Sequence, residues 1–348
     1  MRARHDIPQR IERQAAMCAS MGSAFYGAFL NEMARAYREN AVVRALLDRH
    51  ESRSRVGLRL AGAAHYRALC ADAPAIAAHF PSTGGDGDAI AAWRALASDV
   101  AENDAIYDGL MERPVQTNEV ARALPVLAGM LTISHETRMP LRIFEVGSSA
   151  GLLLNFDRYR YTGASWAWGD PDARLKIENA TREGAPQHLD ADLDVAERRG
   201  CDLHPLNAAD TFDANTLLGF VWPDQRERFD RLRAALEVAR EHPPRIERGD
   251  APEWIERVAQ PVAGAVTVVL HTVMTEHLTA AQRDALRSSI AAIAERASVE
   301  APFAWARMEP GEGGGYETSV TIWPAREEIF LARSDGHAQQ IEWSVRVS

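Results

Sequence analysis

Apolar positions in the first 135 residues recur at helical spacing. Phe25, Phe29 and Met33 lie four residues apart, and a second stripe is formed by Val120, Leu124, Leu127 and Leu131. A loop rich in glycine and aspartate, PSTGGDGD at residues 81–88, interrupts the pattern. The spacing predicts helices over residues 8–135, and we place an N-terminal helical domain at residues 1–135.

The pattern changes near residue 140 into short β-type runs that are bounded by Gly, Asp and Pro. Five runs are separated by helix-length segments, which predicts a parallel sheet built from right-handed crossovers. They span residues 141–147, 164–170, 244–250, 265–273 and 303–310. The later runs TSVTIWP, EEIFLAR and QIEWSVRV have only turn-length gaps, which predicts antiparallel strands. In the last run Ile341, Trp343, Val345 and Val347 alternate with polar residues.

These runs predict an α/β domain over residues 136–348, with a Rossmann-like sheet of five parallel strands plus C-terminal antiparallel strands. The segment between the second and third predicted strands is too long for a simple crossover and contains the helical stretch RERFDRLRAALEVAREH. We therefore predict a helical insertion at about residues 198–242. Such an insertion can lie over the carboxyl edge of the sheet, where α/β folds bind their ligands.

The composition narrows the classes of function. With 46% hydrophobic and 25% charged residues in 348, the chain is typical of a globular protein. A net charge of -10 disfavours nucleic acid as a partner. Lys176 is the single lysine, which leaves no Gly-Lys-Ser/Thr phosphate loop. Neither a secretory signal nor a membrane span is visible, and the three cysteines lie far apart, so we expect a cytoplasmic protein without disulfides.

The segment from Glu145 to Gly151 is the most informative. A strand enters a glycine turn at Gly147, and an amphipathic helix is predicted to begin at Gly151. Glycines let a ligand approach the backbone, and free N–H groups at a helix start favour an anionic group such as a carboxylate. The candidate cofactor-binding residues of this segment are Glu145, Gly147, Ser148, Ser149 and Gly151.

The order Glu-x-Gly-x-x-x-Gly resembles the first motif of class I S-adenosylmethionine-dependent methyltransferases. The resemblance implies that Asp170, at the end of the second predicted strand, accepts hydrogen bonds from ribose hydroxyls. It likewise implies that Asp250, at the end of the third, binds the adenine amino group. The helix start at Gln116, Asn118 and Glu119 can touch the cofactor or its substrate, although Asn118 can also serve simply as a helix cap.

Acceptor-side candidates lie at a strand end and in the insertion. His271 closes the run AVTVVLHTV and is a candidate general base, or else a packed core histidine. His204 and Asp224 in the insertion are catalytic candidates for an acceptor pocket, or else brace the inserted helices. The polar residues Asp202, His204, His271 and His277 lack the spacing of two ligands on one helical turn, so no metal centre is predicted.

A second interpretation of the glycine segment is possible from the same residues. Gly147-Ser148-Ser149-Ala150-Gly151 also spells Gly-x-Ser-x-Gly, the nucleophile elbow of α/β-hydrolases, with Ser149 as nucleophile. Candidate Asp and His partners follow in the required order. Against this reading, only helical sequence precedes residue 141, and Glu145 has no role in that mechanism.

Long ordered segments carry a resemblance to one bacterial family. PVQTNEVAR, FEVGSSAGLLLNFDRYRY, WGDP, RRGCDLHPLN, FVWPDQRERFDRLRAALEVAR, RGDA, VLHTVM and RMEP resemble the family catalogued as domain of unknown function 2332. The resemblance implies a shared fold and site and names no reaction; Ser148 and Leu153 depart from that family's usual alanine and asparagine. We expect a methyltransferase that uses S-adenosylmethionine on a small molecule, with a non-catalytic protein that binds an adenosyl ligand or other metabolite as the alternative.

Overall fold

The computed structural model describes residues 6–116, 118–178 and 184–344. The chain divides into two compact units, one formed by Met1–Thr117 with Asp210–Arg233 and the other by Asn118–Ala209 with Ala234–Ser348. The first is helical and the second contains the large sheet.

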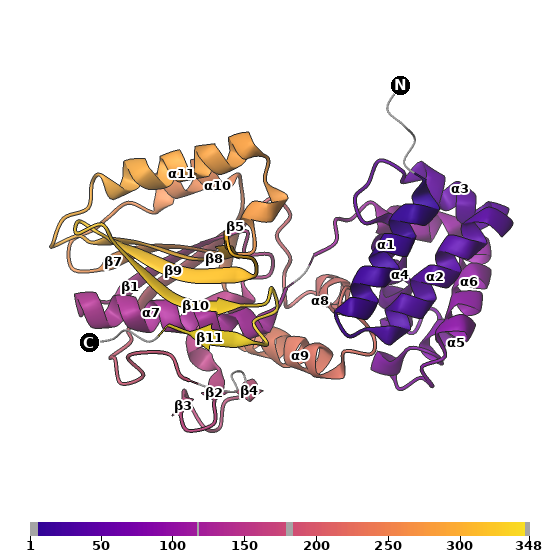
Figure 1. Ribbon diagram of the computed structural model, residues 1–348, viewed down its shortest axis with the longest axis horizontal. Coiled ribbons are helices and arrows are strands. Elements are labelled where there is room, and N and C mark those ends of the chain that lie inside the picture. The colour runs from indigo at the N-terminus through magenta and orange to yellow at the C-terminus, as the bar shows by residue number, and fades with distance from the viewer. Residues whose placement is uncertain (1–5, 117, 179–183, 345–348) are drawn as a thin grey trace. The chain divides into compact units, whose positions relative to one another are not determined.

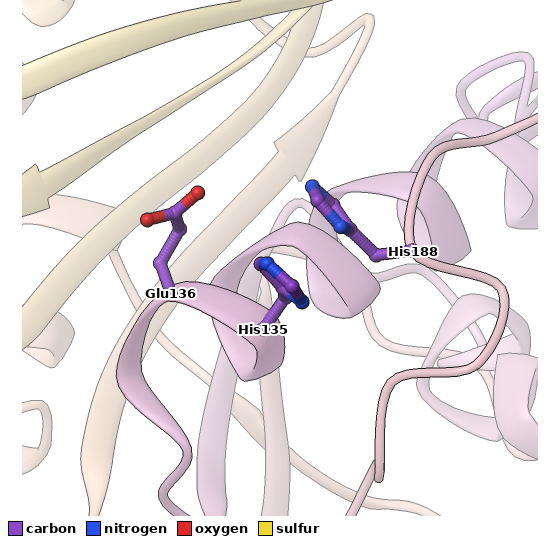
Figure 2. A group of neighbouring side chains, drawn as sticks. All are labelled: His135, Glu136 and His188. Carbon is purple, nitrogen blue, oxygen red and sulfur yellow. The ribbon is translucent and has the colours of Figure 1, made fainter. Parts of the chain in front are cut away.

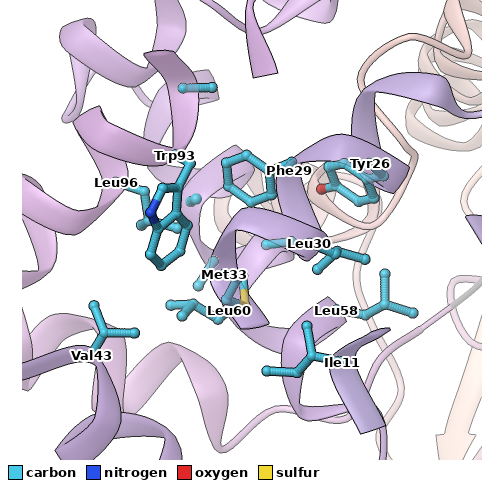
Figure 3. Packing of buried hydrophobic residues seen from close by; sticks show 14 of the residues in the cluster. Ile11, Tyr26, Phe29, Leu30, Met33, Val43, Leu58, Leu60, Trp93 and Leu96 are labelled. Atoms are coloured by element: carbon cyan, nitrogen blue, oxygen red, sulfur yellow. The ribbon is translucent and has the colours of Figure 1, made fainter. Parts of the chain in front are cut away.

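Amphipathic helices build the helical unit. Its elements are α1 (Ile7–Ser20), α2 (Ala24–Glu39), α3 (Ala41–Arg49), α4 (Val56–Leu69), α5 (Pro74–Ala77), the 3-10 turn η1 (Pro81–Thr83), α6 (Ala89–Met111), α8 (Thr211–Gly219) and the first part of α9 (Arg226–Glu241). The predicted stripe on α2 is buried: Phe29 is fully covered and meets Trp93 edge to face at a centroid distance of 6.0 Å (Figure 3). This apolar core is what stabilises the helices, because short isolated helices are marginal in water.

An eight-stranded sheet forms the centre of the α/β unit. Its order is β11-β10-β9-β8-β7-β1-β5-β6. The strands span β1 (Leu141–Val146), β5 (Val195–Asp202), β6 (Arg245–Arg248), β7 (Val266–Thr272), β8 (Phe303–Pro310), β9 (Tyr316–Trp323), β10 (Glu327–Ser334) and β11 (Ile341–Trp343). Five neighbouring strands pair in parallel, in the spatial order β6, β5, β1, β7 and β8. The strands β9, β10 and β11 follow β8 as an antiparallel meander.

Helices cover both faces of this sheet. Figure 1 shows α10 (Ala251–Val258) and α11 (Ala280–Ala294) on one face and α7 (Ala123–Thr137) on the other. Shorter 3-10 segments, η2 (Val120–Arg122), η3 (Leu152–Arg158) and η4 (Thr275–His277), lie in the connections. A second sheet of order β3-β2-β4 is formed by β2 (Arg160–Thr162), β3 (Ala167–Trp168) and β4 (Lys176–Glu178).

Four of the five predicted parallel strands are confirmed, and the second is wrong. The run at residues 164–170 contributes only β3 of the small sheet, while β5 takes the place beside β1. The sequence of β5, VAERRGCD, is too charged to look like an inner strand. Its charges are paired in the fold: Arg198 binds Asp157 at 2.6 Å, and Arg199 binds Glu247.

Two local predictions also need correction. The chain after Gly151 forms the 3-10 segment η3, with a non-helical Asn155 inside it, and not an amphipathic α-helix. The cap near residue 118 is Glu119, whose carboxylate accepts the N–H of Ala121 at 3.1 Å.

The predicted antiparallel runs are confirmed as β9, β10 and β11, but Val345 and Val347 lie outside the described residues.

Among the helices within the described ranges, none is long and apolar enough to cross a membrane.

Candidate functional site

The glycine loop follows β1, an inner strand of the sheet, and so lies at the carboxyl edge of the parallel strands. β1 pairs with β5 on one side and β7 on the other, so that Glu145 lies between Gly200 and Leu270. From β1 the chain continues to β5 and β6 on one side of β1, and it then returns to form β7 and β8 on the other side. Such a reversal in strand order opens a crevice at the carboxyl ends of the strands, where α/β proteins bind ligands.

Glu145 is a buried acid with an unused oxygen. Its side chain is only 3% exposed, and its Oε2 atom makes no hydrogen bond within the described structure. Burial, with a smaller contribution from Asp202, raises the pKa of Glu145 to about 8. An unsatisfied buried carboxyl group is costly to a fold, which makes this residue a candidate for function.

The loop after β1 is held in a left-handed conformation at three positions. Gly147, Ser149 and Gly151 have φ angles of 70°, 53° and 67°. The N–H of Ser148 donates to Cys201 O at 3.0 Å, that of Ser149 to Asp202 Oδ2 at 2.8 Å, and that of Gly151 to Ser148 O at 2.7 Å. These N–H groups are therefore already occupied, and the loop does not present them as the anion cradle that the sequence suggested.

Acidic groups gather at this edge. Asp202 ends β5, the strand beside β1 whose end was predicted to carry Asp170, and Asp250 follows β6 at the N-cap position of α10, where its side chain makes no capping hydrogen bond. These acids lie close to the thiol of Cys201. Burial and the charges of Asp202, Glu145 and Asp250 together raise the pKa of that thiol to about 12. The edge of the sheet beside the glycine loop therefore favours a ligand with positive charge.

His271 lies at the end of β7 with both ring nitrogens bonded. Trp305 Nε1–H donates to His271 Nε2 at 2.9 Å, and His271 Nδ1 lies 2.6 Å from Glu309 Oε1. Since the indole can only donate, Nε2 is the acceptor and Nδ1 carries the proton. A role as general base stays a prediction, and it requires the bond to Trp305 to open.

Glu309, at the end of β8, organises the segment after β7. Besides His271, its carboxylate accepts the N–H of Met274 at 3.0 Å and both the N–H and hydroxyl of Thr275, at 3.1 and 2.5 Å. Burial raises the pKa of Glu309, but the bonds from His271, Thr275 and Met274 outweigh it and hold the pKa below its usual value.

This segment lies against the glycine loop. Val273 has a φ of 51°, a strained conformation for a β-branched residue, and its N–H donates to Met308 O at 2.7 Å. A Cβ atom built on Gly147 would lie 2.6 Å from Met274 Cγ. Gly147 is therefore required for the close approach of Met274, and any ligand at Gly147 must move that flexible side chain.

The remaining predicted residues lie elsewhere. Asp170 is exposed beside β3, where its Oδ1 accepts the N–H of Asp172 at 2.8 Å. Asp224 belongs to the helical unit and accepts Ser23 Oγ at 2.6 Å and the N–H of Phe25 at 3.0 Å, which fixes the start of α2.

The other predicted contacts lie near the unit boundary or the end of β5. The backbone N–H of His204 donates to Asp202 Oδ1 at 2.8 Å, so His204 follows the strand end directly. Gln116 belongs to the helical unit, whereas Asn118 and Glu119 begin the α/β unit.

Sequence reasoning missed two residues that the structure brings to the site. Asp202 was predicted to lie in the helical insertion at about residues 198–242 and was weighed there for a pocket or a metal site, whereas the start of that range belongs to the strand β5. Glu309 stands in the segment RMEP, and its position at the end of a predicted strand was the available signal.

The fold and the site define an α/β protein with acidic groups at the carboxyl edge of a mostly parallel sheet. The chain matches the family described as "uncharacterized protein conserved in bacteria (DUF2332)" over residues 8–343. It therefore belongs to this bacterial family. No curated protein and no solved structure matches the chain significantly.

Proposed function

We propose that the carboxyl edge of β1, β5 and β6 binds S-adenosylmethionine and that the protein is a methyltransferase acting on a small molecule. The observation that carries the proposal is the buried, unpartnered Oε2 of Glu145 at the end of the central strand. S-adenosylmethionine carries positive charge on its sulfonium and ammonium groups, and a carboxylate is their natural partner.

The neighbouring acids support the same ligand. Asp202 ends β5, the strand beside β1, so the contact with the ribose hydroxyls falls to Asp202 and not to Asp170. Asp250 keeps its position after the third strand and is exposed to an incoming adenine. Methyl transfer is an in-line displacement in which positioning provides most of the rate, so a conspicuous catalytic residue is not required.

The sheet supports the proposal in part. The order β6-β5-β1-β7-β8 places β1 beside the point where strand order reverses, as expected for a nucleotide-type site. Two features depart from a Rossmann-type methyltransferase: η3 replaces the first helix, and the strands after β8 form a simple meander. The acceptor-side roles of His271, His204 and Asp224 stay predictions.

The hydrolase reading has less support. A nucleophilic serine needs a histidine with a free nitrogen, and both nitrogens of His271 are bonded, to Glu309 and Trp305. We expect a fluorophosphonate probe to leave Ser149 unlabelled, as read by intact-protein mass spectrometry. Stoichiometric labelling that is lost in Ser149→Ala would favour the hydrolase instead.

Calorimetry tests the cofactor. We expect S-adenosylmethionine and S-adenosylhomocysteine to bind the full chain, and Glu145→Gln to weaken binding about tenfold or more, because a charge-assisted contact is lost. Since the free protein holds a proton on Glu145 near neutral pH, binding of a cationic group releases protons. Titrations in buffers of different ionisation enthalpy measure this release.

Controls separate the possible results. Glu342 is an exposed glutamate on β11, and Glu342→Gln should leave ligand binding and proton release unchanged. Absence of heat with both ligands for the wild type would remove the cofactor assignment. Binding without formation of S-adenosylhomocysteine in a pool of small-molecule acceptors would favour the non-catalytic binding protein.

A further inference from the structure

Three side chains with metal-ligand chemistry meet on the α/β unit, away from the carboxyl edge. His135 and Glu136 lie in the last turn of α7, and His188 lies in the segment that leads to β5. Their ligating atoms all lie within 4.8 Å of one another, although the residues come from segments about fifty positions apart. Figure 2 shows the two imidazole rings against each other with Glu136 beside them.

The chemistry of this set is specific. Two imidazoles and one carboxylate are a ligand set of catalytic zinc sites, and they also suit other divalent transition metals. His135 and Glu136 are exposed, so an ion can reach them from solvent. The exposed Asp190, Asp192 and Asp194 follow His188 and add negative charge that favours a cation.

The rings need one adjustment to share an ion. His135 and His188 are stacked with a centroid distance of 3.7 Å and an interplanar angle of 17°. The lone pairs of two parallel rings run side by side and do not converge on one point. Sharing one ion therefore requires the exposed His135 ring to rotate out of the stack, and side-chain rotations at the surface are rapid.

We propose that His135, Glu136 and His188 form a binding site for one divalent ion of the zinc class, with water completing its coordination. The ion ties the end of α7 to the segment before β5. Imidazoles bind metals only when neutral, so protons compete with the ion for these two ligands.

Titration with the metal alone tests this site on the full chain. We expect saturable binding of one Zn²⁺ per chain by calorimetry, and a visible absorption spectrum of low-symmetry Co²⁺ when cobalt is the probe. His188→Ala and His135→Ala should each lower the affinity about tenfold or more, and Glu136→Gln should lower it as well. Excess Zn²⁺ should raise the midpoint of thermal unfolding of the wild type and not of the variants.

The matched control is His277→Ala. His277 is another exposed histidine of the same unit with a glutamate beside it, since its Nε2 lies 3.7 Å from Glu276 Oε1. This variant should bind one ion with wild-type affinity. The proposal is overturned if the wild type binds no ion saturably, if His135→Ala binds as tightly as the wild type, or if His277→Ala loses the same affinity. Because His135 is exposed at a helix end, its substitution keeps the test valid even where His188→Ala fails to fold.

Discussion

Replacing Glu145 by glutamine is expected to stabilise the protein at alkaline pH and to leave its stability nearly unchanged at acid pH. The pKa of Glu145 is raised from 4.5 to about 8 by burial and by Asp202. Above pH 4.5 the unfolded chain loses this proton while the folded chain keeps it, so the free energy of unfolding falls as the pH rises to about 8. The loss in the free energy of unfolding over this pH range is on the order of 5 kcal/mol, and the neutral amide of glutamine avoids this loss.

Denaturant unfolding at a series of pH values measures this effect. Wild type and Glu145→Gln should agree near pH 4 and diverge progressively toward about pH 9, where the variant is more stable. The exposed Glu342→Gln should follow the wild type throughout. Parallel curves for Glu145→Gln and wild type would show that this carboxyl group titrates normally and is not a buried acid kept for function. Stability gained together with lost ligand binding is the expected trade-off at a functional site.

Replacing Glu309 by alanine should destabilise the α/β unit by about 3 kcal/mol or more. The carboxylate accepts bonds from His271 Nδ1, the N–H of Met274, and the N–H and hydroxyl of Thr275. Its removal leaves these donors without their acceptor in a largely buried place. The segment that holds Met274 against Gly147 is then released, and hydrogen exchange at residues 273–275 should speed up.

Glu317→Ala is the control for Glu309→Ala. Glu317 pairs with Arg333 at 2.7 Å, but both side chains are substantially exposed. A surface ion pair of this kind contributes about 1 kcal/mol or less. Equal losses of stability in the two variants would contradict the organising role of Glu309.

The patterns of single segments predicted much of the fold. The apolar stripe of Phe25, Phe29 and Met33 is buried on α2, and the runs that became β1, β7 and β8 are inner strands. These elements follow from periodicity, because a buried face repeats its apolar residues locally. The strand β5 could not be predicted in this way, because Arg198 and Arg199 are neutralised by partners distant in sequence.

The candidate site was predicted less completely than the fold. Glu145, Gly147 and Asp250 were found because each stands at the end of a recognisable strand. Asp202 and Glu309 were not assigned their places, and the N–H groups of Ser148 and Ser149 were not known to be occupied.

The sequence by itself determined the strand β1 that carries Glu145, the glycine turn after it and the runs that form β7 and β8, because these depend on neighbours within a few residues. Only the tertiary structure decided that β5 lies beside β1, that Met274 closes over Gly147, and that His135 meets His188. Those contacts depend on which distant segments pair, and pairing is set by the packing of the whole unit.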